Sequence, residues 1–184
     1  MVIRSRTFLG LGALMLGCLA AAAFAADATT PSAEGGAWVP HKYTFNFMGF
    51  TTTYSCEGLE DKLRLLLKMS GAGPTPRDVK VVAPCTAQIG RPDRLAFAYL
   101  TFNSLQPPAD TAPGQWRRVV LSPRHPNELD YGDCELVEEF RDRVLPMFAT
   151  RNVKNNVTCV PHQDEGSNFY LSYDVFAPPP QVKP

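Results

Sequence analysis

An internal repeat constrains this chain more than any other feature of its sequence. A run that begins at Cys56 with Cys-Glu-Gly-Leu-Glu has an echo that begins at Cys134 with Cys-Glu-Leu-Val-Glu. The two tryptophans of the chain, Trp38 and Trp116, each lie 18 positions before one of these cysteines. Chance similarity explains poorly why tryptophan and cysteine recur in one order. The pattern therefore predicts a diverged duplication whose two copies superpose in space.

Each copy also closes on a second cysteine. Cys85 follows Cys56 by 29 positions, and Cys159 follows Cys134 by 25. The difference falls within residues 70–78, where glycine and proline make insertion cheap. Four cysteines permit three pairings, and duplicated units should carry duplicated bridges. We predict structural disulfides between Cys56 and Cys85 and between Cys134 and Cys159.

The spacing of these cysteines disfavours metal and redox chemistry. Structural zinc sites use closely spaced ligand pairs, whereas these cysteines are isolated from one another. The chain also lacks a Cys-x-x-Cys motif, which disfavours an oxidoreductase of the thioredoxin type.

The first 25 residues are typical of a signal peptide. Arg4 and Arg6 precede an apolar run, and the sequence Ala-Phe-Ala ending at Ala25 matches a signal-peptidase site. A lipoprotein with lipid on Cys18 is the less favoured alternative, because it would leave an unusually apolar mature N-terminus. We predict a periplasmic or secreted protein that has no stable membrane span and works where disulfides persist.

Charge excludes some partners by electrostatics. Loss of Arg4 and Arg6 reduces the 18 basic residues to 16, against 18 acidic ones, and neither sign is concentrated in a block. Nucleic acid is therefore not an expected partner. No motif in the chain indicates a cofactor or a metal.

Hydrophobic periodicity predicts strand, helix, strand and strand in each copy. In the first copy these are residues 43–47, a helix from Cys56 that stops at Gly71, residues 79–83 and residues 95–102. In the second they are residues 119–121, a helix from Cys134 that Pro146 ends, residues 153–159 and residues 169–176. Ser55 and Asp133 are the expected N-caps. We expect an α+β fold with both helices on one face of a mixed sheet.

These elements divide the chain into six segments. We predict a signal peptide over residues 1–25, a flexible lead-in over 26–37, a first repeat unit over 38–102, a Pro-rich linker over 103–114, a second unit over 115–177 and a Pro-rich tail over 178–184.

Two polar loops in the second unit form a weak candidate site. One loop carries His125, Glu128 and Asp130, and the other carries His162 and Asp164. Histidine beside carboxylates suits a metal site or acid–base chemistry. No ligand spacing supports a metal, and exposed loops are polar in any case.

The leading functional hypothesis is a non-catalytic protein that binds a protein, peptide or small ligand of the cell envelope through a sheet edge or groove. A hydrolase or metal-dependent enzyme that uses the loops of His125 and His162 is the first alternative. An inhibitor of a secreted enzyme, presenting a disulfide-stapled loop, is the second.

Peptide mapping without reduction tests the predicted topology. We expect one fragment pair joined by Cys56–Cys85 and another joined by Cys134–Cys159, because each copy should close on itself. A crossed pairing, such as Cys56 with Cys134, would contradict the repeat-based assignment.

Overall fold

A computed structural model describes residues 34–73, 78–82, 95–163 and 166–180 of the chain. Residues 1–30 and 31–184 are separate compact units, and all described residues belong to the second. The predicted signal peptide, Cys18, Cys85 and Asp164 lie outside the described residues. No helix in the described part is long and apolar enough to cross a membrane.

The described strands form one sheet of six in the order β2-β3-β1-β4-β6-β5. The first three are β1 (Glu34–Met48), β2 (Asp78–Val82) and β3 (Leu95–Gln106). The others are β4 (Ala112–Leu121), β5 (Thr150–Thr158) and β6 (Asn168–Ala177). Each half of the chain contributes three neighbouring strands, and in each half the third strand in sequence lies between the first two.

The predicted α+β class is confirmed, but the prediction of a mixed sheet is wrong. Every strand pair in the described sheet is antiparallel. β1 and β2 both run antiparallel to β3, so they point the same way without being neighbours. A mixed sheet requires two neighbouring strands that run parallel. The strands that flank the helix, β1 and β2, do run parallel, but β3 lies between them.

Helix α1 (Cys56–Met69) begins and ends as its sequence predicts. The Ser55 hydroxyl accepts a hydrogen bond from the Gly58 N–H at 3.0 Å, and Gly71 adopts a left-handed φ of 82° just after the helix. The helix buries four leucines that recur at helical spacing, namely Leu59, Leu63, Leu66 and Leu67. Amphipathic spacing therefore sets which face of α1 packs inward.

Helix α2 (Cys134–Arg143) begins at Cys134 and ends before Pro146, as predicted, but the predicted side-chain cap from Asp133 is missing. A short 3-10 turn, η2 (Tyr131–Asp133), precedes it, and the Asp133 side chain makes no cap bond to α2. The Asp130 carboxylate caps η2 instead, by accepting from the Gly132 N–H. Pro146 falls in a second 3-10 turn, η3 (Leu145–Met147), so regular helix ends before the proline.

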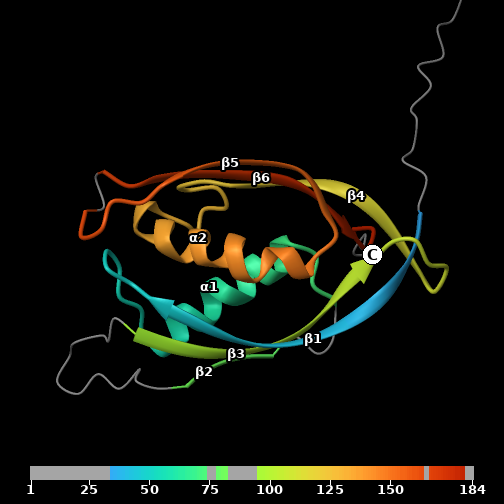
Figure 1. Cartoon of the computed structure of the whole chain (residues 1–184), viewed down its shortest axis with the longest axis horizontal. Helices are drawn as coiled ribbons and strands as arrows, with labels where there is room; N and C mark the ends of the chain where they lie inside the picture. The colour runs from blue at the N-terminus through green and yellow to red at the C-terminus, as the bar shows by residue number, and fades with distance from the viewer. Residues whose placement is uncertain (1–33, 74–77, 83–94, 164–165, 181–184) are drawn as a thin grey trace, which may run out of the picture. The chain divides into compact units, whose positions relative to one another are not determined.

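Both helices lie between the three strands of the first half and the three strands of the second half (Figure 1). One hydrophobic cluster joins the helices to both groups of strands, and its largest fully buried members include Phe45, Phe102, Phe140, Phe169 and Tyr173. The Arg117 guanidinium on β4 donates to the Met69 carbonyl at the end of α1, at 2.8 Å. The two halves therefore share a single core.

The two groups of strands join over a short ladder between Glu34–Gly36 of β1 and Ala112–Gly114 of β4. A Cβ on Gly36 would lie 2.7 Å from Phe176 Cε1, and a Cβ on Gly114 would lie 2.4 Å from the same atom. Both backbones therefore pack directly on the Phe176 ring. Only glycine allows this close approach.

The observed strands reach into segments that the sequence assigns to connections. β1 begins at Glu34, within the predicted lead-in, and β3 and β4 leave only residues 107–111 between them. The Cys134–Cys159 disulfide is present, with the Cα atoms 5.6 Å apart. The Cys56–Cys85 bridge stays a prediction, because Cys85 is not described.

The close packing of Gly36 and Gly114 on the Phe176 ring, called the glycine joint below, predicts that one added methyl group lowers the free energy of unfolding. Gly114→Ala should lower the free energy of unfolding by about 1–3 kcal/mol, since the new Cβ overlaps a buried ring. Gly58→Ala on α1 is the control: its Cβ meets the Ser55 hydroxyl at 3.1 Å, and alanine favours helix over glycine. Urea unfolding of both variants measures the difference. Equal effects would show that the joint tolerates a side chain.

Candidate binding edge

The predicted polar site does not assemble among the described residues. His125 and Glu128 are exposed in the loop after β4, and the Asp130 carboxylate is engaged in capping η2. His162 is exposed in the loop between β5 and β6, where its ring lies edge-on to Phe50 at 5.8 Å. No hydrogen bond, ion pair or ring contact in the described part of the chain joins His125 to His162.

Metal binding has no support in this region. Among the described residues there is no group of three or more histidine, cysteine, aspartate or glutamate side chains that could hold an ion. Asp164, the remaining member of the predicted site, is not described. The site formed by the two loops therefore stays a prediction.

A buried carboxylate cluster, which the sequence analysis did not predict, lies at the start of α2. Asp133 is 1% exposed, and it accepts hydrogen bonds from the Tyr54 hydroxyl at 2.5 Å and from Lys62 Nζ at 2.6 Å. Burial, together with the neighbouring Asp133 carboxylate, raises the pKa of Tyr54 well above its ordinary value. The Tyr54 hydroxyl therefore stays protonated and remains a donor.

Glu135 completes this link between the halves. Its carboxylate accepts hydrogen bonds from the backbone N–H of Phe50 at 2.7 Å and of Thr51 at 3.0 Å. Glu57, the matching residue of the first copy, is exposed. Because every acceptor in the cluster has a donor from the first half, we interpret the cluster as a clamp rather than a reactive site.

The two outermost strands of the sheet differ in whether side chains bond to their free backbone edges. At β2, the Glu60 carboxylate on α1 accepts from the Val81 N–H at 3.0 Å, and the Arg64 guanidinium donates to the Val79 carbonyl at 3.0 Å. Glu60 and Arg64 also form an ion pair at 2.7 Å. The helix thus covers the edge of β2 and blocks further pairing there.

One hydrogen bond shows which residues of β5 point their backbone N–H and C=O groups toward the neighbouring strand β6. The Phe176 N–H donates to the Ala149 carbonyl, so even-numbered residues of β6 point toward β5. The pairs Lys154–Ser172 and Asn156–Tyr170 are therefore hydrogen-bonded, and the residues between them point their backbone groups away from β6. Asn155 and Val157 carry these outward N–H and C=O groups.

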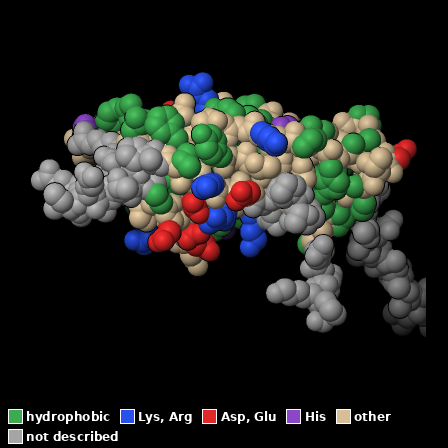
Figure 2. Space-filling view, turned by 90° about the horizontal axis from the view of Figure 1, so that it is seen from below, with side chains coloured by type: hydrophobic (Ala, Val, Ile, Leu, Met, Phe, Trp, Pro, Cys, Tyr) green, Lys and Arg blue, Asp and Glu red, His purple; other side chains and the backbone are tan. Residues whose placement is uncertain are grey.

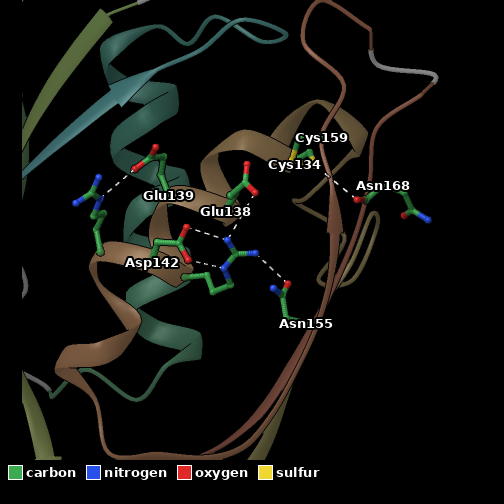
Figure 3. A network of polar contacts seen from close by, with 9 residues as sticks. Cys134, Glu138, Glu139, Asp142, Asn155, Cys159 and Asn168 are labelled. Carbon is green, nitrogen blue, oxygen red and sulfur yellow. Dashed lines mark hydrogen bonds and ion pairs between the residues drawn. A yellow bond between two sulfur atoms is a disulfide. The ribbon is translucent and has the colours of Figure 1, made fainter.

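No side chain of the described residues bonds to this outward backbone. In an ungapped alignment of the predicted repeat on Cys56 and Cys134, Glu138 matches Glu60 and Asp142 matches Arg64. Arg141 holds both carboxylates, at 2.6 Å from Asp142 and 3.6 Å from Glu138, and donates to the Asn155 side chain at 3.0 Å (Figure 3). The polar groups of α2 thus bind one another, and the backbone edge of β5 stays uncovered.

Exposure is high along the whole of β5. Seven of its nine residues are exposed and the other two are partly buried. Val153 is 48% exposed, an unusual value for a valine in a strand. The Cys134–Cys159 bridge ties the strand's C-terminal end to the start of α2 (Figure 3), so the exposed strand is anchored at that end.

The outer faces of the two halves differ in chemistry. Figure 2 looks onto the first half, where hydrophobic side chains lie among polar ones; Tyr99 is 54% exposed there and Met48 51%. On the outer face of the second half, Arg118 and Arg151 both contact Asp174. The Arg118 hydrogen bond holds the pKa of the Asp174 carboxyl below its ordinary value.

The covered edge of β2 predicts that Glu60 and its aligned residue Glu138 differ in how much they contribute to the free energy of unfolding. Glu60→Ala should lower the free energy of unfolding by about 1 kcal/mol, because the Val81 N–H and Arg64 lose their acceptor. Glu138→Ala should change it by less than about 0.5 kcal/mol, since its only described partner is an exposed ion pair. Urea unfolding at neutral pH gives both values. A loss of the same size in both would mean that Glu138 also supports an edge.

The Glu60 effect should depend on pH. The hydrogen bond from the Val81 N–H, followed by Arg64, holds the pKa of Glu60 below its ordinary value of 4.5. A lowered folded pKa stabilises the fold above the unfolded pKa, and this contribution is lost as pH falls through the folded value. The stability difference between wild type and Glu60→Ala should therefore shrink below pH 4.5. A constant difference down to about pH 2 would contradict this origin.

In the described sheet, side chains of α1 cover the outward backbone of β2, whereas the outward groups of Asn155 and Val157 on β5 have no side-chain partner among the described residues. Searches against family models, curated proteins and solved structures found no match for this chain.

Proposed function

We propose that this protein is an exported, non-catalytic binding module that takes up an extended segment of a partner protein as an added strand at β5. The observation that carries the proposal is the open backbone edge of β5, which presents N–H and C=O groups at Asn155 and Val157. An added strand satisfies such groups with main-chain hydrogen bonds. Free N–H and C=O groups along an edge strand are a template for pairing with another chain.

The contrast with β2 supports this assignment. The same fold covers one edge with Glu60 and Arg64, yet the matching positions of α2 turn their charges toward Arg141. We infer that the second edge was freed for a partner.

Duplication is part of the same proposal. The two halves have the same order of elements and the same order of strands, which supports descent from one strand–helix–strand–strand unit. One copy then supplies a closed scaffold, and the other supplies the binding strand. The clamp of Asp133 and Glu135 holds the loop after β1 and helix α1 against α2.

Export is proposed from the predicted signal peptide together with the disulfide. The Cys134–Cys159 bridge requires an oxidising compartment to persist, and the periplasm or the extracellular space provides one. In that compartment the disulfide stays intact while a partner binds at the open edge.

A proline substitution separates strand addition from other modes of binding. Asn155→Pro removes an outward N–H without removing a bond to β6, so the fold should survive while partner retention falls about tenfold or more. Asn155→Ala is the matched control: it removes the contact with Arg141 but keeps the N–H. Proteins of an envelope extract retained by wild type and by Asn155→Ala, and lost with Asn155→Pro, are the expected result.

Two outcomes would contradict the proposal. Retention of every captured protein by a folded Asn155→Pro variant would exclude the β5 backbone as the binding element. Loss of the captured proteins with His125→Ala and His162→Ala, but not with Asn155→Pro, would move the site to the polar loops. Near-ultraviolet circular dichroism checks that each variant keeps its packed core.

A further inference from the structure

The chemistry of β5 indicates which kind of strand fits the open edge; this inference rests on the strand-addition function proposed above. β5 reads Thr-Arg-Asn-Val-Lys-Asn-Asn-Val-Thr, with two cations and no acidic residue. An incoming strand lies beside these side chains at the spacing of a neighbouring strand, where opposite charges attract and like charges repel. The sign of β5 therefore selects the partner.

A bulge places both cations on one face. Strict alternation would put Arg151 and Lys154, three positions apart, on opposite faces of the sheet. The register shifts between these two residues, and Asn152 adopts a left-handed φ of 54° within the shift. Arg151 consequently faces Asp174 and Lys154 faces Ser172, which lie two positions apart on β6. Both cations therefore point to the outer face.

The outer face around the edge keeps an excess of positive charge. Asp174 is shared by Arg118 and Arg151, and Arg151 also lies over the Trp116 ring, 4.1 Å from its centroid. Lys154 is exposed and forms no ion pair or hydrogen bond with any described residue. Among the described residues, Arg118 and Arg151 share the Asp174 carboxylate, and a second carboxylate, Glu34, accepts from the indole N–H of Trp116, the ring that Arg151 covers. Lys154 is the cation of β5 that has no described counter-charge.

The inner side of the edge is different. The Asn155 side chain points to α2, where Arg141 is already bound by Glu138 and Asp142. The three side chains carry one positive and two negative charges, so the inner side keeps one negative charge in excess. A partner strand that bears carboxylates is therefore expected to place them on the outer side.

We propose that β5 recruits an acidic extended segment, with carboxylates at alternate positions on the outer face opposite Arg151 and Lys154. A second copy of this chain is the less suitable occupant, because β5 would bring its own cations beside those of its partner without an acidic residue to offset them. Alternating carboxylates match the geometry, since the two cations stand at neighbouring positions of one face. Charge then supplies specificity, and the backbone supplies the pairing.

Three synthetic peptides, each titrated into the mature protein, test whether β5 prefers a partner strand of negative charge. In each peptide threonine alternates with one second residue, which is glutamate, glutamine or lysine. Amide chemical shifts of the protein are followed during titration at low salt. We expect the glutamate peptide to shift the amides of β5 and to bind at least about tenfold more tightly than the lysine peptide. Its affinity should fall as the salt concentration rises.

Matched lysine variants locate the effect. Lys154→Gln should weaken the glutamate peptide about two- to fivefold, which is the range of one exposed ion pair. Lys80→Gln, at the aligned position on the covered strand β2, should leave the affinity unchanged. Both residues are exposed on edge strands, so neither substitution disturbs the core.

The outcomes separate this inference from the function on which it rests. Equal binding of all three peptides at β5 would overturn the acidic preference while strand addition remained. Failure of every peptide to shift β5 would count against strand addition itself. Dimerisation of the free protein, with β5 amides protected in the dimer, would identify a second copy as the occupant and overturn the acidic partner.

Discussion

An open sheet leaves unpaired N–H and C=O groups along its two outermost strands, and each group needs a partner from a side chain, from water or from another chain. The first half meets this requirement internally, because Glu60 and Arg64 reach from α1 to Val81 and Val79. In the alignment of the predicted repeat, the residue that matches Arg64 is Asp142, which cannot donate to a carbonyl. No side chain of the described residues bonds to the outward backbone of β5.

The rest of the fold holds the open strand in a fixed place. Glycines at the joint let β1 and β4 pack on the Phe176 ring, so the strands of both halves form one sheet. Asp133 and Glu135 fasten the start of α2 to the first half, and Cys134 ties the same turn to the end of β5. Few polar groups of α2 remain for the edge. The scaffold is therefore rigid where the proposed partner binds, which limits the ordering cost of association.

Local sequence signals predict the local features of this fold. The Ser55 cap, the leucine stripe of α1 and the Cys134–Cys159 bridge follow from spacing that neighbouring residues define. The signals fail where distant residues decide the outcome. Gly35 and Gly36 read as flexible, yet Gly36 is buried in β1 because Phe176 leaves no room for a side chain. The mixed-sheet prediction failed in the same way, since strand order depends on pairing across the whole chain.

In the candidate site, too, local sequence predicts some features, and distant residues decide the others. Asp133 reads as a helix cap, but its partners Tyr54 and Lys62 are 79 and 71 positions away in sequence, beyond any local pattern. The charge reversal from Arg64 to Asp142 is visible in the aligned copies, and its meaning appears only once β2 and β5 are known to be the edges. Histidines in polar loops supplied the candidate site residues instead, because residue type is easier to recognise than an uncovered backbone.

Amide hydrogen exchange of the free mature protein tests the central claim most directly, because it compares the two edges in one molecule. The account predicts slow exchange at Val81, whose N–H is bonded to Glu60, and exchange at least about tenfold faster at Asn155 and Val157, whose outward N–H groups have no partner among the described residues. Lys154 and Asn156, which are bonded to β6, should be protected and serve as internal references. Equal protection of Val81, Asn155 and Val157 would show that β5 is already covered and would contradict an open binding edge.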